Sequence, residues 1–181
     1  MRVVVNILIF SIFCLLSCGK SGKQKVEASF DKLWKKEFII PNLNDAVYLG
    51  RDTIINRMDY KANKIVIYYD STDCTSCEVS ELWRWKAMIK DFNSHNVSFV
   101  FILAPSKKHE DEVRDYLYLY PLPFPVFIDA SYVVSQSNSQ LLSEKYFNVF
   151  MLNEDNEVIL IGNPIKNNEL YKLYEEVINS F

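Results

Sequence analysis

Two cysteines three positions apart, Cys74 and Cys77, are the residues of this chain best suited to chemistry. They follow an apolar run over 65–69 and precede a stretch with helical periodicity. At the start of a helix, backbone N–H groups and the helix dipole stabilise a thiolate. The position therefore favours a redox couple that exchanges disulfides. A local disulfide and half of a metal site are the other interpretations of such a pair.

The neighbouring side chains determine where the helix begins and how acidic the first thiol is. Thr75 and Glu78 have the spacing of a capping box, which predicts a helix start beside Cys74. Asp73 opposes a lowered pKa of Cys74 by like charge, so the expected lowering is modest. Asp73, Thr75 and Ser76 are thus predicted to support the two cysteines.

The first residues of the chain have the layout of an export signal. Arg2 is followed by an apolar stretch through Leu16, and a polar stretch begins after Cys18. The ending at 15–18, Leu-Leu-Ser-Cys, resembles the lipobox of bacterial lipoproteins. Residues 1–17 are therefore predicted to be a removable signal, and Cys18 a lipidated residue that holds the protein to a membrane of the cell envelope, facing the periplasm or the cell surface. Cys74 and Cys77 would then be the only free thiols.

The elements that must position the pair form an α/β alternation after residue 64. Apolar runs predict strands at 65–69, 97–103 and 124–129, and periodic segments predict helices at about 75–93, 108–120 and 138–146. Turn residues at 154–156 predict a hairpin of strands at 148–152 and 157–161. A last helix follows an Asn167 or Asn168 cap, with its apolar face at Leu170, Leu173, Tyr174, Val177 and Ile178.

Early strands that alternate with helices imply parallel pairing, and the late hairpin adds an antiparallel edge. The expected fold is a three-layer α/β sandwich, with a central mixed sheet and helices on both faces. Residues 18–29 are predicted to be a flexible tether, 30–63 an N-terminal extension and 64–181 the main domain. Within the extension we expect a short helix at 30–36 and short strands at 38–41 and 47–49.

Residues 64–181 resemble the thioredoxin-like, TlpA/redoxin group of membrane-anchored thiol-disulfide oxidoreductases, including the lipid-anchored members common in Bacteroidota. The matching features are the strand before Cys74-x-x-Cys77, the 124–129 strand before a short helix, and the hairpin that ends at Gly162. The resemblance implies that Cys74 attacks a substrate disulfide and that Cys77 resolves the mixed disulfide.

Two positions depart from the pattern of this group. Its members have a cis-proline opposite the cysteine pair, where this chain has Phe147. A cis bond before a residue other than proline costs roughly 2.5 to 4 kcal/mol, so a trans bond and a reshaped docking loop are expected. Many members also carry a buried acid six residues before the first cysteine, where this chain has Tyr68.

Other kinds of site are not expected. The sequence has 23 acidic and 20 basic side chains spread along it, which is not the footprint of a nucleic-acid-binding protein. His95 and His109 would complete a metal site with the two cysteines, but they lie in polar segments without suitable spacing. We therefore expect no metal and no cofactor.

The sequence thus predicts an enzyme, an envelope thiol-disulfide oxidoreductase. Its partners would be cysteine-containing envelope proteins or a redox partner protein, with the membrane reached through the lipid on Cys18. A thioredoxin-like binding module with little redox activity and a metal-delivery protein are the alternatives.

Overall fold

The computed structural model describes residues 31–55, 60–70, 79–143 and 147–181. The chain divides into two compact units, Met1–Leu33 and Trp34–Phe181. Residues 31–33, the described end of the first unit, are helical. The predicted signal and tether lie outside the described residues.

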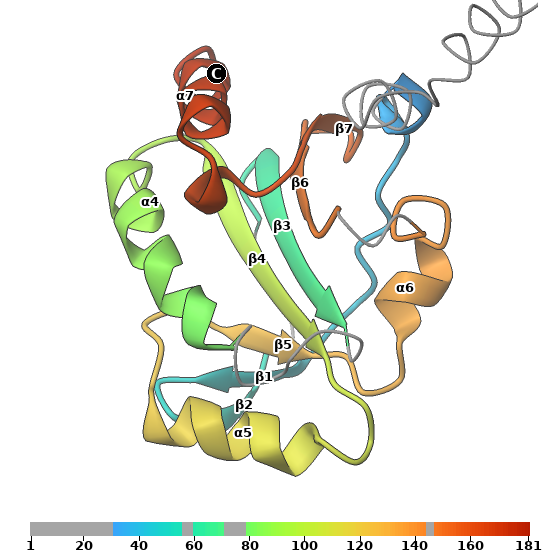
Figure 1. Ribbon diagram of the computed structural model, residues 1–181, viewed down its shortest axis with the longest axis vertical. Helices are drawn as coiled ribbons and strands as arrows, with labels where there is room; N and C mark the ends of the chain where they lie inside the picture. The colour runs from blue at the N-terminus through green and yellow to red at the C-terminus, as the bar shows by residue number, and fades with distance from the viewer. Residues whose placement is uncertain (1–30, 56–59, 71–78, 144–146) are drawn as a thin grey trace, which may run out of the picture. The chain divides into compact units, whose positions relative to one another are not determined.

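The second unit is built on a seven-stranded mixed sheet with the order β2-β1-β5-β4-β3-β6-β7 (Figure 1). Strands β3, β4 and β5 are parallel, and a hairpin flanks them on each side, with β1 antiparallel to β5 and β6 antiparallel to β3. The strands are β1 Asp45–Tyr48, β2 Arg51–Ile54, β3 Asn63–Asp70, β4 Val97–Ala104, β5 Val126–Ile128, β6 Val149–Leu152 and β7 Val158–Ile161.

Helices cover both faces of this sheet, as the sequence predicts. The helices are η1 Leu82–Arg84, α4 Trp85–Asp91, α5 Glu110–Leu119, α6 Val133–Ser137, η2 Pro164–Lys166 and α7 Asn168–Ile178. Helices α4 and α6 lie on opposite sides of the β3–β4 pair (Figure 1). Adjacent residues of a strand point to opposite faces. Tyr69 accordingly lies beside Val79, at the start of the helical segment that leads into α4, and Tyr68 lies beside Ser135 of α6.

The larger core packs α4, α5 and α7 against one face of the sheet. Trp85 of α4 is fully buried, and its ring meets Phe99 and Phe101 of β4 edge-on, at centroid distances of 6.3 and 5.9 Å. On α7, Asn167 caps the helix by accepting N–H bonds from Glu169 and Leu170. Tyr174 and Ile178 are buried as predicted, whereas Leu173 is 41% exposed.

The segment that precedes β1 covers the outer edge of β7 and then crosses to α6. Val158 exchanges backbone hydrogen bonds with residues 35 and 36, each of 2.9 Å. Ile39 is next held by the buried side chain of Asn138, which accepts the Ile39 N–H at 2.8 Å and donates to the Ile39 carbonyl at 2.7 Å. These bonds hold the backbone at residues 35, 36 and 39, and residues 38–41 form no strand. The predicted strand at 38–41 is therefore wrong.

The third predicted helix is also displaced. Residues 138–143 form turns, and the helix of this region is α6, at Val133–Ser137. The buried carboxylate of Asp129 starts α6 earlier by accepting the N–H groups of Val133 and Val134, each at 2.9 Å. Asn138 ends it, because its amide is turned toward Ile39 and toward the Val134 carbonyl.

The remaining predicted elements agree with the structure within a few residues, apart from two features. The sequence prediction missed β2, which pairs only with β1. The helix predicted at 75–93 is described from Val79 onward and contains a 3-10 segment at Leu82–Arg84. Among the residues with described coordinates, no helix is long and apolar enough to cross a membrane.

Candidate functional site

The predicted redox residues lie in one short segment between two described ends. Strand β3 ends at Asp70, and the helical chain resumes at Val79. Cys74, Cys77, Asp73, Thr75 and Ser76 lie in between, outside the described residues, as does Cys18. The structure therefore locates the two chain ends that carry the cysteine segment.

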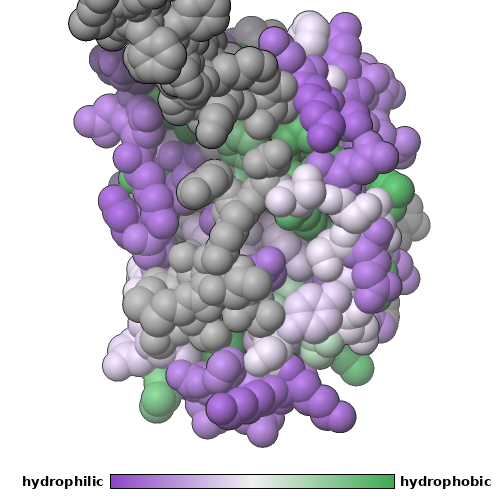
Figure 2. All heavy atoms as spheres, turned by 45° about the vertical axis from the view of Figure 1, so that its right-hand side comes forward, coloured by the Kyte–Doolittle hydropathy of each residue, from purple (hydrophilic) through white to green (hydrophobic). Residues whose placement is uncertain are grey.

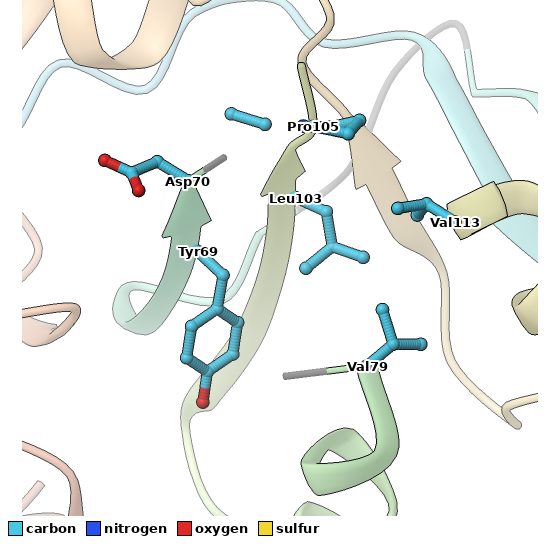
Figure 3. A pocket seen from close by; sticks show the side chains of 7 residues that line it. Tyr69, Asp70, Val79, Leu103, Pro105 and Val113 are labelled. Carbon is cyan, nitrogen blue, oxygen red and sulfur yellow. The ribbon is translucent and has the colours of Figure 1, made fainter. Parts of the chain in front are cut away.

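These two ends meet at a small hollow at the C-terminal edge of β3 and β4 (Figure 3). Asp70 and Val79 both line the hollow, together with Tyr69, Leu103, Ala104, Pro105 and Val113. The side chains of Leu103, Val79 and Val113 point toward one another, whereas the Asp70 carboxylate points away from them (Figure 3). The free volume is about 10 Å³, close to the space that one water molecule needs. The hollow thus has an apolar floor and is too small for a substrate.

Phe147, the residue at the expected cis-proline position, also lies at this edge. The register of β3 with β6 pairs Ile67 with Val149, and the Tyr68 N–H extends the pairing by donating to the Asn148 carbonyl at 2.8 Å. Phe147 is the next residue along, and its side chain is half-buried. No cis peptide bond occurs in the described segments. The bond between Tyr146 and Phe147, for which a trans form is expected, includes a residue outside them.

β7 does not continue alongside Phe147. Among the described residues, the last backbone bond from that side is the one that the Gly162 N–H donates to the Val149 carbonyl at 2.9 Å. In an antiparallel pair, successive residues direct their backbone groups to alternate sides. Since Asn148 faces β3, the backbone of Phe147 faces the side where β7 has ended. Its backbone groups are thus directed past the end of β7, at the same edge of the sheet as the end of β3.

Tyr68, which replaces the acid of the resembling group, is buried on the α6 side of the sheet. Burial raises the pKa of Tyr68 to about 12; the Ser135 hydroxyl lowers it, and the carboxylates of Asp129 and Asp70 raise it further. The phenol consequently stays protonated near neutral pH and cannot accept a proton there as a carboxylate would.

Asp129 is a residue of this region that sequence reasoning missed. It follows directly after β5, and its two oxygens hold the first N–H groups of α6. One turn of chain away, the Tyr132 hydroxyl donates to the carbonyl of Pro105, which lines the hollow. The usual capping signal could not have placed this helix, because its N-cap position is Tyr132, in a left-handed conformation, and Asp129 reaches the N–H groups of Val133 and Val134 from four and five residues away.

The structure does not bring the two histidines together. His95 precedes β4 and His109 follows it, so the eight residues of β4 separate them by roughly 25 Å. His109 Nδ1 lies 3.1 Å from the Ser106 hydroxyl, and the His95 ring packs on Phe92 at 5.5 Å. Within the described ranges, no group of three or more His, Cys, Asp or Glu side chains could hold a metal ion.

The sheet order, the parallel core strands, the terminal hairpin and the final helix define a thioredoxin-like α/β fold. No protein-family model matches the sequence, and no curated protein matches it. Solved structures do share the fold. An uncharacterized thioredoxin-like protein from Porphyromonas gingivalis is 14% identical with a TM-score of 0.51, over 80% of this chain and 94% of that one.

Two further structures of this fold belong to proteins that are named for disulfide chemistry. A putative thiol:disulfide interchange protein DsbE from Chlorobium tepidum is 13% identical with a TM-score of 0.52, over 77% of this chain and 99% of its own. The thioredoxin domain of a thiol-disulfide oxidoreductase from Bacteroides vulgatus is 10% identical with a TM-score of 0.52, over 79% of this chain and 98% of its own. At these identities the similarity establishes the fold.

Proposed function

We propose that this protein is a thiol-disulfide oxidoreductase of the cell envelope that exchanges a Cys74–Cys77 disulfide with cysteines of exported proteins. The observation that carries the proposal is that the cysteine segment joins Asp70 to Val79 at the edge where the Asn148 carbonyl pairs with Tyr68. A peptide docked along Phe147 would have its own disulfide beside this segment. The structural similarity to proteins named as disulfide-exchange proteins supports the same role.

The exchange needs no cofactor, because two electrons pass directly from the Cys74–Cys77 dithiol to the partner's disulfide. The Cys74 thiolate attacks one sulfur of the partner's disulfide, the partner's S–S bond breaks, and the released thiolate takes up a proton. Cys77, as a thiolate, then attacks the Cys74 sulfur of the mixed disulfide and releases the partner's second thiol. Two electrons have passed to the partner, and a redox partner protein must return the Cys74–Cys77 pair to the dithiol.

The Cys77→Ser variant tests this reaction. It should accumulate mixed disulfides between Cys74 and client proteins, visible on non-reducing gels and removed by dithiothreitol, and the purified wild type should reduce insulin disulfides. The Cys74→Ser variant is the matched control and should trap nothing. If Cys77→Ser trapped no more than Cys74→Ser and the wild type could not be cycled between dithiol and disulfide, the proposal would fail.

We propose further that lipid on Cys18 anchors the protein, with the domain facing the periplasm or the cell surface. The lipobox-like sequence at 15–18 supports this location. Metabolic labelling with a palmitate analogue should tag the wild type, and Cys18→Ala should abolish the tag. A tag that survives this substitution would exclude Cys18 as the lipidated residue.

A binding module with little redox activity is the second candidate. The observation that favours it is the buried phenol of Tyr68, whose pKa is raised to about 12 by burial, so that it supplies no base for proton transfer. Such a module would bind its partners equally well with and without Cys74. Partner capture that is unchanged in Cys74→Ser and resistant to dithiothreitol would support it over the enzyme.

A further inference from the structure

Exposed apolar side chains gather where the β1–β2 turn meets the C-terminal end of α5. The Leu49 N–H donates to the Leu122 carbonyl at 3.3 Å, and a Cβ added to Gly50 would lie 3.2 Å from Pro121 Cβ, so the two segments are in contact. The cluster consists of Tyr48, Leu49, Leu119 and Tyr120, which we call the apolar tip. These side chains are 37%, 51%, 75% and 50% exposed.

A leucine is unfavourable at position 49 because its backbone conformation is strained and because its side chain is exposed to water. Its φ is +50°, and that of Gly50 is +74°. Turns with two positive φ values normally carry Asn, Asp or Gly, because a left-handed conformation is strained for other residues. Strained residues of this kind occur preferentially at functional positions. A leucine that is both strained and exposed therefore indicates a surface with a use.

The apolar tip carries little negative charge. The stretch from Tyr116 to Ile128 contains no charged residue. Asp52, next to the turn, is engaged by the Arg114 guanidinium and the Tyr118 hydroxyl, each at 2.8 Å. Arg51 remains exposed at the margin, and the nearest acid of α5 is Asp115, one helical turn before Leu119. Leucine side chains bordered by tyrosines and an arginine are typical of surfaces that enter the membrane interface.

The apolar tip lies at the opposite end of the sheet from the candidate redox site. α5 begins after β4 ends and runs back along the sheet, so Leu119 lies at the edge where the parallel strands begin. The antiparallel pairing of Val47 with Val126 places the β1–β2 turn at the same edge. Asp70 and Asn148 lie at the other edge. A partner on the apolar tip therefore does not cover the edge that carries Asp70 and Asn148.

The size of the apolar tip decides between a protein and a lipid partner. With about 200 Å² for each large side chain, the exposed fractions amount to roughly 400 Å². A stable protein interface needs about 800 Å² on each partner, whereas shallow insertion into a lipid surface needs only a small apolar area next to an anchor. On the face seen in Figure 2, the hydrophobic side chains that are visible lie in small scattered areas.

We propose that the apolar tip inserts into the surface of the lipid bilayer. The domain is then held with the edge that carries Asp70 and Asn148 pointing away from the membrane. The proposal rests on the anchoring at Cys18 proposed above. A tether of about 12 residues spans roughly 20 Å, so the anchored domain stays within reach of the bilayer. The lipid then supplies the anchor, and the apolar tip sets the orientation.

Nitroxide labels test the orientation in the full lipidated chain, reconstituted in phosphatidylethanolamine–phosphatidylglycerol vesicles with Cys74→Ser and Cys77→Ser. Leu119→Cys carries the label, and Leu173→Cys on α7, an exposed leucine outside the apolar tip, is the matched control. The ratio of collisions with oxygen to collisions with a water-soluble nickel complex should be several-fold higher at 119 than at 173. Adding Leu49→Asn should lower the ratio at 119 at least twofold while stabilising the fold, because asparagine tolerates a positive φ.

Equal ratios at 119 and 173 would refute the proposal. Dipolar broadening between labels at 119 would also refute it and would show that a second copy covers the apolar tip. Labelling of Cys18 would show that the lipid anchor is missing and would therefore refute the proposal as well. Insulin reduction, measured on the unlabelled wild-type chain, tests the redox function independently of these outcomes.

Discussion

The amide of Asn138 should contribute a large part of the stability of the domain, because it holds together segments 99 residues apart in sequence. The side chain is 3% exposed and makes three hydrogen bonds: it accepts the Ile39 N–H at 2.8 Å and donates to the carbonyls of Ile39 and Val134 at 2.7 and 2.8 Å. Replacement by alanine leaves three backbone groups without this partner. At about 1 kcal/mol for each net hydrogen bond, and more where a group stays buried, Asn138→Ala should cost about 3 kcal/mol.

Urea unfolding followed by far-UV circular dichroism measures this cost, and native-state hydrogen exchange localises it. The loss is a large fraction of the 5–15 kcal/mol that a domain usually has, and the Ile39 amide should lose protection first. Gln136→Ala is the matched control, because Gln136 is an exposed amide near the end of the same helix that donates to the Ser131 carbonyl. It should cost less than about 0.5 kcal/mol. A cost as small for Asn138→Ala, with the Ile39 amide still protected, would refute the reasoning.

Three further predictions concern other parts of the domain. Burial raises the folded-state pKa of Tyr68 to about 12, above the unfolded value near 10, so the contribution of Tyr68 to stability is full below pH ~10 and falls as pH rises toward 12. In urea unfolding measured at several pH values, Tyr68→Phe should make the free energy of unfolding fall less steeply over this range. An unchanged slope would contradict the prediction. The Arg114 side chain is 15% exposed and pairs with three carboxylates, so Arg114→Met should lower the free energy of unfolding by about 1–2 kcal/mol. Arg84→Met, the control, should change it by almost nothing, because the Arg84 side chain is 54% exposed. Equal costs in urea unfolding would contradict a stabilising role of the Arg114 ion pairs. Gly162→Ala should cost about 1–3 kcal/mol in the same assay, because φ is +114° and a Cβ would lie 2.9 Å from Leu170 Cδ2; a stability unchanged within error would show that the backbone there relaxes freely.

Local physics made much of the fold predictable. The apolar run before the cysteines, bounded by polar residues, becomes the buried strand β3. The Asn167 cap with apolar residues at helical spacing becomes α7, and the turn at 154–156 closes the β6–β7 hairpin. Each of these elements depends on neighbours within a few positions, so its signal is contained in a short stretch of sequence.

The errors arise where hydrogen bonds or strand pairing with other residues override the preference of the local composition. The apolar stretch at 38–41 has the composition of a strand, but Asn138 satisfies the backbone of Ile39, and the stretch stays irregular. The helix predicted at 138–146 forms earlier because the Asp129 carboxylate reaches the N–H groups of Val133 and Val134. β2 was missed because its four residues are stabilised by pairing with β1 more than by their own composition.

The candidate site also combines features that the local sequence predicts with features that the tertiary structure sets. The sequence by itself predicts the chemistry, from two thiols in a segment between a strand and a helix, and predicts that the other two cysteines belong to a signal and a lipid anchor. Only the tertiary structure decided that the Tyr68 N–H donates to the Asn148 carbonyl, 80 positions away in sequence. It also decided that the apolar tip lies at the edge of the sheet opposite to this bond. Periodicity and capping act over a few residues, whereas strand order and register depend on how the whole sheet buries its two faces.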